Sequence, residues 1–394
     1  MNKHFDNNKR ILVIDFCNYE DYPIGGYLSF AKNLMGCFGH DLALVGIATQ
    51  HNDPVGKWFQ KDINGCKYDF FAIARYNRSK TKHLIPDRLA GFLLVNYYKK
   101  RIFKIDITNI FIQRQELLLS IAGSNCRNIC YSFAGLENPL NISKYRYAGH
   151  IANLFEWFFF KRLKFVKTIL ASGDENAIDE MIQRSNGEVS KQSIIKFPTR
   201  INTDIFRPLS RVEVRKELNL SNTATILITT GRLAPLKGWK FMIDCFILFE
   251  KEVSNSKFYF IGEGEEYKKI QDYIAKNNLT EKVLLVGEKK SEEIALFLNA
   301  SDLFIMGSYK EGWSTSLIEA IACGIPACVT NFSSAKDIII EGENGYVIDE
   351  HNTEMFAKGM LRAVEMPSPV YNDNVMEYGV NKLKEELLKI WELI

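Results

Sequence analysis

The sequence lacks the features that would assign it to a membrane-spanning, fibrous or disordered class. No uncharged apolar run approaches the roughly 18 residues that a spanning helix needs. The first strand-like run, residues 11–16, is short and carries Asp15, so we expect neither a transmembrane helix nor a signal peptide. No internal repeat or low-complexity tract is present. The 394 residues are 46% hydrophobic and 25% charged, which predicts a folded protein of two or three domains.

Paired cysteines are also missing. The eight cysteines are scattered, mostly inside apolar stretches, without CxxC spacing and without histidines at ligand distance. This pattern favours neither a disulfide framework nor a zinc site. We expect reduced, mostly buried thiols in a cytoplasmic protein, and no metal site.

A large net charge is absent as well. Lys and Arg number 50 and Asp and Glu 47, a net charge of +3 that is too small to favour a nucleic-acid partner. The charge is unevenly distributed, however. Residues 1–206 hold 28 basic and 19 acidic side chains, whereas residues 207–394 hold 22 and 28. The first half is therefore basic and the second acidic.

Short β-rich runs alternate with longer helical stretches along the whole chain. This alternation is typical of strand-helix-strand units, and it predicts an α/β protein with two parallel sheets covered by helices on both faces. The predicted strands of the first series are residues 11–16, 42–48, 68–73, 109–113, 128–133, 168–171 and 194–197. Those of the second are residues 225–229, 257–261, 283–286, 303–306, 327–330 and 345–348.

A polar stretch between Pro198 and Pro208 separates the two series and carries no helical period, so we place the domain boundary there. Residues 1–203 form the first predicted domain and residues 204–375 the second. An apolar period near the end predicts a final helix with one buried face, and we assign residues 376–394 to the first domain.

The most informative segment spans residues 301–326. A buried strand ends near Met306, a polar loop follows, and a helix is predicted to begin near Ser314, with Thr315 and Ser316 as further capping residues. Unpaired N–H groups and the positive end of the helix dipole then face the loop beyond the strand, which favours phosphate binding there.

Two glutamates bracket this expected phosphate site. Glu311 lies in the loop, beside Gly312 and Trp313, and Glu319 lies about one turn inside the helix. Carboxylates suit sugar hydroxyls because they accept hydrogen bonds from vicinal OH pairs. Taken alone, Glu311 is equally interpreted as a solvated loop carboxylate, and Glu319 as an ordinary partner of the helix dipole.

The loop after the first strand of the second series carries two cations. Gly231 permits a tight exit from the strand, and Arg232 and Lys237 are placed to converge on an anion. The alternative is two solvated loop cations. Gly25 and Gly26 precede the first helix of the chain, where the backbone would closely approach a ligand, or where they simply form a flexible loop.

A dinucleotide fingerprint is not supported. Gly262 and Gly264 begin a similar strand-to-helix turn, but Tyr267 occupies the third glycine position, and the first strand of the chain is followed by no GxGxxG turn. A nicotinamide or flavin enzyme is therefore not favoured.

Taken together, these segments resemble the family-4 glycosyltransferases of the GT-B fold, in which two Rossmann-like domains with parallel sheets face each other across a cleft. The resemblance is densest over residues 224–349 and covers GRLAPLKG, FIGEGEE, SDLFIMGSYKEGWSTSLIEA, ACGIPACVT and ENGYVI, in that order. Glu311 and Glu319 match the Glu-x7-Glu motif of the family. Weaker matches are Gly25-Gly26 and INTDIFRP.

The resemblance implies a nucleoside-diphosphate sugar, of UDP or GDP type, as co-substrate, with no other cofactor and no metal. Arg232 and Lys237 would hold the diphosphate and stabilise it as it leaves. Glu319 would accept the ribose hydroxyls and Glu311 those of the donor sugar, while the N–H groups of Ser314, Thr315 and Ser316 complete the phosphate site. The remaining donor-binding positions would be Gly25, Gly26, Gly231, Gly312 and Trp313.

Two positions depart from the family. Many relatives have a histidine near the reacting sugar where this chain reads Tyr131 to Gly135. Trp313 stands where a smaller residue is frequent, which would alter the sugar pocket unless this indole packs inside the fold.

The acceptor side carries aromatic and cationic residues that interleave within the first half, for example in NYYKKRIFK and FEWFFFKRLKFVK. Tyr97, Tyr98, Phe103 and Phe158 would enter an anionic bilayer while the neighbouring cations meet headgroups; the alternative is an internal amphipathic helix whose lysines snorkel. A lipid-linked acceptor, contact with the inner face of the cell membrane and no nucleic acid follow as expectations.

The function expected from the sequence is retaining, metal-independent hexosyl transfer to a glycan or lipid-linked glycan, in bacterial surface polysaccharide or glycoconjugate synthesis. The alternatives are a nucleotide-sugar epimerase or hydrolase of the same fold, and a non-catalytic subunit that binds a nucleotide sugar.

Overall fold

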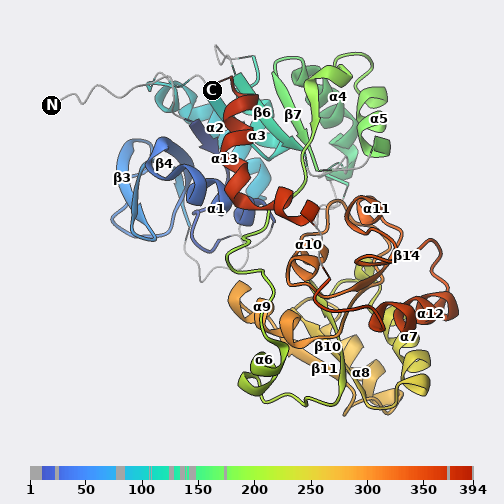
Figure 1. Ribbon diagram of the computed structural model, residues 1–394. Coiled ribbons are helices and arrows are strands. Elements are labelled where there is room, and N and C mark those ends of the chain that lie inside the picture. Colours follow the sequence, from blue (N-terminus) through green and yellow to red (C-terminus); the bar gives the residue numbers. More distant parts are fainter. Residues whose placement is uncertain are drawn as a thin grey trace. The chain divides into compact units, whose positions relative to one another are not determined.

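The computed structural model describes residues 11–22, 26–76, 85–105, 107, 109–123, 128–133, 138, 140–141, 148–172, 175–370 and 373–392. The chain forms two compact units (Figure 1). Unit 1 contains residues Met1–Pro198 and Asn381–Ile394, and unit 2 contains Thr199–Val380. These divisions lie within five residues of the predicted ones, at 203/204 and 375/376.

Unit 1 is built on an eight-stranded sheet of order β3-β4-β2-β1-β5-β6-β7-β8. Every pairing is parallel except that of β3 with β4. The strands are β1 (Ile11–Ile14), β2 (Leu42–Ala48), β3 (Trp58–Ile63), β4 (Cys66–Arg75), β5 (Asn109–Ile112), β6 (Asn128–Phe133), β7 (Thr168–Ala171) and β8 (Ile194–Lys196).

Helices cover both faces of this sheet. One face is packed by α1 (Gly26–Phe38) and α13 (Val380–Ile390) through buried apolar residues such as Leu28 and Leu387. The other face is packed by α2 (Asp87–Ile102), α3 (Gln115–Ile121), α4 (Ala152–Leu163) and α5 (Glu175–Arg184). Short 3-10 turns are η2 (Gly39–Asp41), η3 (Ala148–Ile151) and η4 (Lys191–Ser193).

The last helix belongs to unit 1. Figure 1 shows α13 beside α1, and the ring of Trp391, just beyond α13, lies 6.1 Å from that of Phe38. Leu383 and Leu387 are fully buried in the same apolar cluster. The chain therefore returns to its first unit through one amphipathic helix.

Replacing Leu387 with alanine is expected to destabilise unit 1 by about 2–5 kcal/mol, because the truncation leaves a cavity under α13. Hydrogen exchange in the strands of unit 1, compared with those of unit 2, would measure the effect. The exposed Lys382 on the same helix provides the control, and K382A is expected to change little. Equal protection in both variants would contradict the anchoring role of Leu387.

Unit 2 is built on a six-stranded parallel sheet of order β11-β10-β9-β12-β13-β14. The strands are β9 (Thr225–Thr230), β10 (Ser256–Ile261), β11 (Val283–Gly287), β12 (Leu303–Met306), β13 (Ala327–Thr330) and β14 (Gly345–Ile348). α7 (Trp239–Glu252), α8 (Tyr267–Lys276) and α12 (Thr353–Val364) pack on one face. α9 (Ser291–Ala300), α10 (Thr315–Ala322) and α11 (Ala335–Ile338) pack on the other, and α6 (Arg211–Glu217) contacts α9.

The segment that follows Pro198 is part of unit 2 rather than a free linker. Ile201 and Phe206 are buried in its apolar core. Ile201 also donates its N–H to the carbonyl of Tyr378 at 2.9 Å and accepts from the N–H of Val380 at 2.9 Å. The two chain segments at this end of the unit are therefore tied to each other by backbone hydrogen bonds.

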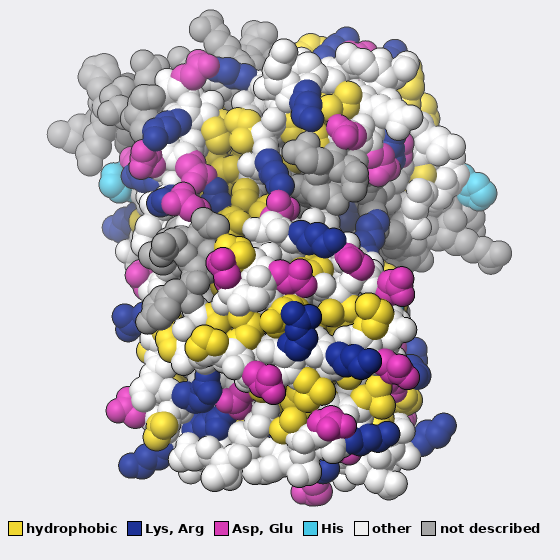
Figure 2. Space-filling model, turned by 45° about the vertical axis from the view of Figure 1, so that its right-hand side comes forward, with side chains coloured by type: hydrophobic (Ala, Val, Ile, Leu, Met, Phe, Trp, Pro, Cys, Tyr) yellow, Lys and Arg dark blue, Asp and Glu magenta, His cyan; other side chains and the backbone are white. Residues whose placement is uncertain are grey.

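On the face shown in Figure 2, basic and acidic side chains are interspersed. In the part of the chain that the structure describes, no helix is both long and apolar enough to cross a bilayer.

Candidate active site

The candidate active site lies at the switch point of the unit 2 sheet. From β9 the chain first adds β10 and β11 on one side, and then β12, β13 and β14 on the other. In open parallel sheets of this kind, ligands bind in the crevice outside the carboxyl ends of the two strands where the order reverses. Here those strands are β9 and β12, and the loops that follow them carry Arg232, Lys237 and Glu311.

Glycines allow these loops to approach one another closely. A Cβ on Gly262 would lie 1.9 Å from the carbonyl oxygen of Gly231, and a Cβ on Gly238 would lie 1.9 Å from that of Gly307. Gly238 also begins α7 with a φ of 65°, a left-handed conformation that favours glycine. The glycines of GEGEE thus have a packing role, which explains their likeness to an incomplete dinucleotide fingerprint.

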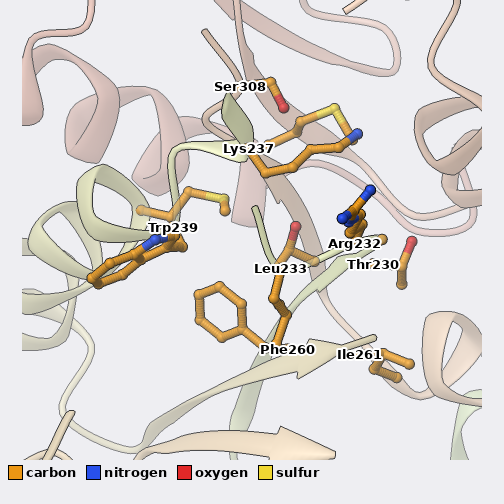
Figure 3. Close-up of a pocket in the computed structure, with 12 residues that line it drawn as sticks. Thr230, Arg232, Leu233, Lys237, Trp239, Phe260, Ile261 and Ser308 are labelled. Carbon is orange, nitrogen blue, oxygen red and sulfur yellow. The ribbon is translucent and has the colours of Figure 1, made fainter. Parts of the chain in front are cut away.

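Lys237 and Glu311 meet at the centre of the site. The ammonium of Lys237 donates to Oε1 of Glu311 at 2.5 Å, and the hydroxyl of Ser308 donates to the same oxygen at 2.8 Å. Ser308 is itself fixed, because its carbonyl accepts from the hydroxyl of the buried Thr330 at 2.8 Å. Figure 3 shows Lys237 and Arg232 extending into one pocket, beside Ser308 and Thr230. The cavity itself measures only about 20 Å³, and the space around it is open to solvent.

The predicted helix start is confirmed. Ser314 caps α10 and its hydroxyl accepts from the N–H of Leu317 at 3.3 Å. The N–H of Ser314, which we expected to bind phosphate, instead donates to the hydroxyl of Ser334 at 3.4 Å. Thr315 and Ser316 donate no backbone hydrogen bond among the described residues, so they are the N–H groups that remain for an anion.

Glu319 lies one turn inside α10, with its side chain partly buried among apolar residues. Loss of solvent raises the pKa of this carboxyl from 4.5 to about 8. Among the described residues no basic side chain forms an ion pair with it. A partly buried carboxyl without a cationic partner is suited, once ionised, to accept hydrogen bonds from the hydroxyl groups of a ligand.

Arg232 is held by a different glutamate. Its guanidinium contacts Oε2 of Glu265 at 3.0 Å, and 72% of the arginine side chain is exposed. Each of the two predicted diphosphate-binding cations therefore has a carboxylate partner. A diphosphate would replace Glu265 at Arg232 and Glu311 at Lys237.

Replacing Glu265 with glutamine is expected to strengthen the binding of a nucleoside diphosphate by up to about fivefold, since exposed ion pairs contribute at most about 1 kcal/mol. Isothermal titration calorimetry with UDP and GDP would measure the change. E252Q, at the far end of α7, provides a control for the loss of one negative charge. Weaker binding by E265Q would show that this carboxylate does not compete with the ligand.

The structure assigns the other predicted residues to different environments. The Trp313 side chain is buried and its ring lies 5.4 Å from that of Tyr378, so the indole packs inside unit 2. The carbonyl of Gly312 accepts from Ser334. Gly26 begins α1 with open space around it, so nothing there requires a glycine. Gly25 lies outside the described residues.

At the first of the two departures from the family, Tyr131 is a buried residue of β6 whose ring lies 5.8 Å from that of Phe159. Residues 134–137, in the rest of that stretch, lie outside the described residues. Tyr131 is therefore a core residue of unit 1.

Sequence reasoning missed a second polar cluster, at the switch point of the unit 1 sheet, where β1 and β5 end. Asp15 is fully buried and forms an ion pair with Arg114. The amide of Gln113 donates to Asp15 at 3.3 Å, and Glu116 lies 4.0 Å from Arg114. Burial raises the pKa of Glu116. The available signal was that polar residues directly follow two buried strands.

Among the described residues no group of three or more histidine, cysteine, aspartate or glutamate side chains is arranged to hold a metal ion. Metal independence stays a prediction. The seven cysteines within these residues are free thiols, and five of them are buried.

Each unit contains a doubly wound sheet, and the second sheet has two cations and the start of α10 at its switch point. This two-unit α/β architecture is the GT-B fold. Residues 210–380 match the family described as "Glycosyl transferases group 1". The match covers nearly all of unit 2 and supports a glycosyltransferase.

Curated relatives match over part of the chain. An uncharacterised glycosyltransferase of Methanocaldococcus jannaschii is 29% identical over 40% of this chain and 47% of its own length. The UDP-Gal:alpha-D-GlcNAc-diphosphoundecaprenol alpha-1,3-galactosyltransferase of Escherichia coli is 24% identical over 45% of this chain and 46% of its own. The chain thus spans about half the length of these relatives.

Solved structures match over both units. Sucrose-phosphate synthase from Thermosynechococcus elongatus superposes with a TM-score of 0.73 at 16% identity, covering 98% of this chain and 99% of its own. HepE from Anabaena, in complex with UDP, superposes with a TM-score of 0.70 at 14% identity, covering 98% and 100%. At these identities the likeness shows the fold.

Proposed function

We propose that this protein is a retaining glycosyltransferase that moves a sugar from a nucleoside-diphosphate sugar to a glycan or a lipid-linked glycan. The observation that carries the proposal is the convergence of Arg232, Lys237, Glu311 and the start of α10 at one switch point. The family of residues 210–380 supports the same function.

The donor is a UDP or GDP sugar. Its diphosphate lies against Arg232, Lys237 and the N–H groups of Thr315 and Ser316, where two cations and the α10 dipole compensate its charge. Glu319 accepts the ribose hydroxyls, and Glu311, released from Lys237, accepts hydroxyls of the sugar. The UDP bound to the similarly folded HepE makes a uridine nucleotide the first to test.

Transfer follows a front-side route. The acceptor hydroxyl forms a bond to the anomeric carbon on the face from which the diphosphate departs, and its proton passes to an oxygen of that diphosphate. The bond between the anomeric carbon and the phosphate oxygen breaks with its electron pair, so the new linkage keeps the original configuration. Lys237, Arg232 and the amide dipoles stabilise the charge that develops, without a metal ion.

The acceptor is a lipid-linked glycan of bacterial surface polysaccharide or glycoconjugate synthesis, made at the inner face of the cell membrane. The Escherichia coli relative, whose name specifies a diphosphoundecaprenol-linked sugar, supports this acceptor class. Of the four aromatic residues expected to enter a bilayer, Tyr97 and Phe158 are exposed, whereas Tyr98 and Phe103 pack partly against the unit 1 core.

The test is release of nucleoside diphosphate with and without acceptor. The full chain is first screened by thermal shift against UDP and GDP sugars, and the donor that binds is then supplied with a prenyl-diphosphate-linked N-acetylglucosamine. Release of nucleoside diphosphate only with acceptor, and a product of unchanged anomeric configuration, are expected. Release without acceptor would indicate a hydrolase, conversion of the donor into an epimeric nucleotide sugar would indicate an epimerase, and binding without turnover would indicate a non-catalytic subunit.

A further inference from the structure

A long apolar groove in unit 1 has no role in the site described above. Its floor is α3 at Leu119, and its walls are α2 at Leu89 and Phe92 and the α4 side at Leu154 and Phe158. The volume is about 450 Å³, within the range of small-molecule sites. The further lining residues are Arg88, Glu116, Leu140, Ile151, Phe155 and Arg162.

The groove exposes large apolar side chains that a protein normally buries. Leu89 is 48% exposed, Leu154 56% and Phe158 45%. On α4 the lining residues follow a helical period, because Leu154, Phe158 and Arg162 succeed one another at intervals of four. A contiguous exposed apolar surface of this kind indicates a binding site.

An arginine stands at each end of the groove. Arg88 lies 3.9 Å from Glu116, at the start of α3, and 40% of its side chain remains exposed. Arg162 donates to the carbonyl of Ala122 at 3.0 Å, just beyond the end of α3. The one carboxylate of the groove, Glu116, is buried and lies near both Arg88 and Arg114. The groove is therefore apolar along its length and cationic at its ends.

The Arg88 end lies beside the polar cluster of the unit 1 switch point. Glu116 contacts Arg88 in the groove and Arg114 in that cluster, and Arg114 in turn contacts Asp15. A ligand with its chain in the groove and its anionic group at Arg88 would thus present any attached group to the carboxyl ends of β1 and β5. Those ends are where ligands of such sheets bind.

We propose that this groove binds one isoprenoid or acyl chain that carries a phosphate, with the chain on Leu89, Phe92, Leu154 and Phe158 and the phosphate at Arg88. This deepens the proposed function, because it names the part of the chain that selects a lipid-linked acceptor. Charge complementarity favours a phosphate-bearing chain over a second copy of this protein. If two copies paired through this groove, each would bring its own Arg88 and Arg162 against those of the other.

The test uses farnesyl phosphate and its uncharged alcohol, farnesol, with the full chain in solution. Calorimetry is expected to show binding of both compounds, tighter for the phosphate. L89Q and L154Q are each expected to weaken both ligands about tenfold, because a buried leucine contributes roughly that factor. R88Q is expected to weaken only farnesyl phosphate. Deuterium exchange should slow in α2, α3 and α4.

The matched control is Leu93, which lies one turn from Leu89 on α2, is 49% exposed and does not line the groove. L93Q is expected to bind both ligands within about twofold of the unmodified chain. Equal effects of L89Q and L93Q, or protection outside the three helices, would overturn the proposal. So would a concentration-dependent dimer that L89Q abolishes, because the groove would then be an interface between copies.

Nucleotide binding in the same preparation separates this proposal from the proposed function. Farnesyl phosphate binding without UDP or GDP binding would leave the groove standing and end the donor assignment. Nucleotide binding without farnesyl phosphate binding would end the groove assignment alone.

Discussion

Replacing Lys237 with alanine is expected to lower kcat by about 100-fold or more, while the Kd of the donor changes only a few-fold. The Lys237 ammonium has an anionic partner within the chain, Glu311 at 2.5 Å. Donor binding therefore exchanges one anion for another, and the net gain in affinity is small. As the diphosphate departs its charge increases, and Lys237 then stabilises the transition state more than the bound donor.

Single-turnover rates and equilibrium titration on the same variant would separate these two effects. Lys240 gives a matched control, because it lies three residues further on, is 58% exposed and pairs with Asp244 within α7. K240A is expected to retain the rate. K237R, which keeps the charge on a longer and planar group, is expected to retain part of it. An unchanged kcat in K237A, with folding verified by thermal unfolding, would remove this lysine from the mechanism.

Much of the fold was predictable because parallel strands buried on both faces form continuous apolar runs. All thirteen predicted strands are present, and six of them, β2, β6, β7, β12, β13 and β14, begin and end at the predicted residues. β3 was missed because it is an edge strand whose sequence, WFQKDI, alternates with polar residues. The signal for its hairpin was present, since Asn64 and Gly65 form the turn with φ of 52° and 80°.

The donor side was more predictable than the acceptor side for a physical reason. Lys237 and Glu311 lie in the strand-to-helix turns that follow β9 and β12, two strands that are neighbours in the sheet, so the predicted topology implies their proximity. The ion pair of Arg232 with Glu265, by contrast, depends on the rotamers that these two side chains adopt. The groove between α2, α3 and α4 depends on how three helices pack, which no local period encodes.

Replacing Glu319 with glutamine is expected to weaken nucleotide binding about 10- to 100-fold and to abolish its dependence on pH. Burial raises the pKa of the Glu319 carboxyl to about 8, and only its ionised form accepts both hydroxyls of a ribose. Binding stabilises that form and lowers its pKa. The affinity of the unmodified chain should therefore rise from pH 6 to pH 8 and level off above it, whereas that of E319Q should stay flat.

The same carboxyl gives stability the opposite pH dependence: nucleotide affinity should rise with pH, whereas the free energy of unfolding should fall. Because its folded pKa lies above the ordinary value of 4.5, the folded chain holds a proton that the unfolded chain has lost between pH 4.5 and pH 8. Stability should fall over that interval by about 1.4 kcal/mol per pH unit at most, and E319Q should lack this loss. Urea unfolding at pH 5.5 and pH 8 would measure it, with E292Q on the exposed face of α9 as the control. A variant that binds nucleotide less tightly yet is more stable at pH 8 has lost a ligand-binding group. A variant that loses both nucleotide affinity and stability at pH 8 has lost a structural contact, and that result would contradict the assignment of Glu319 to the ribose.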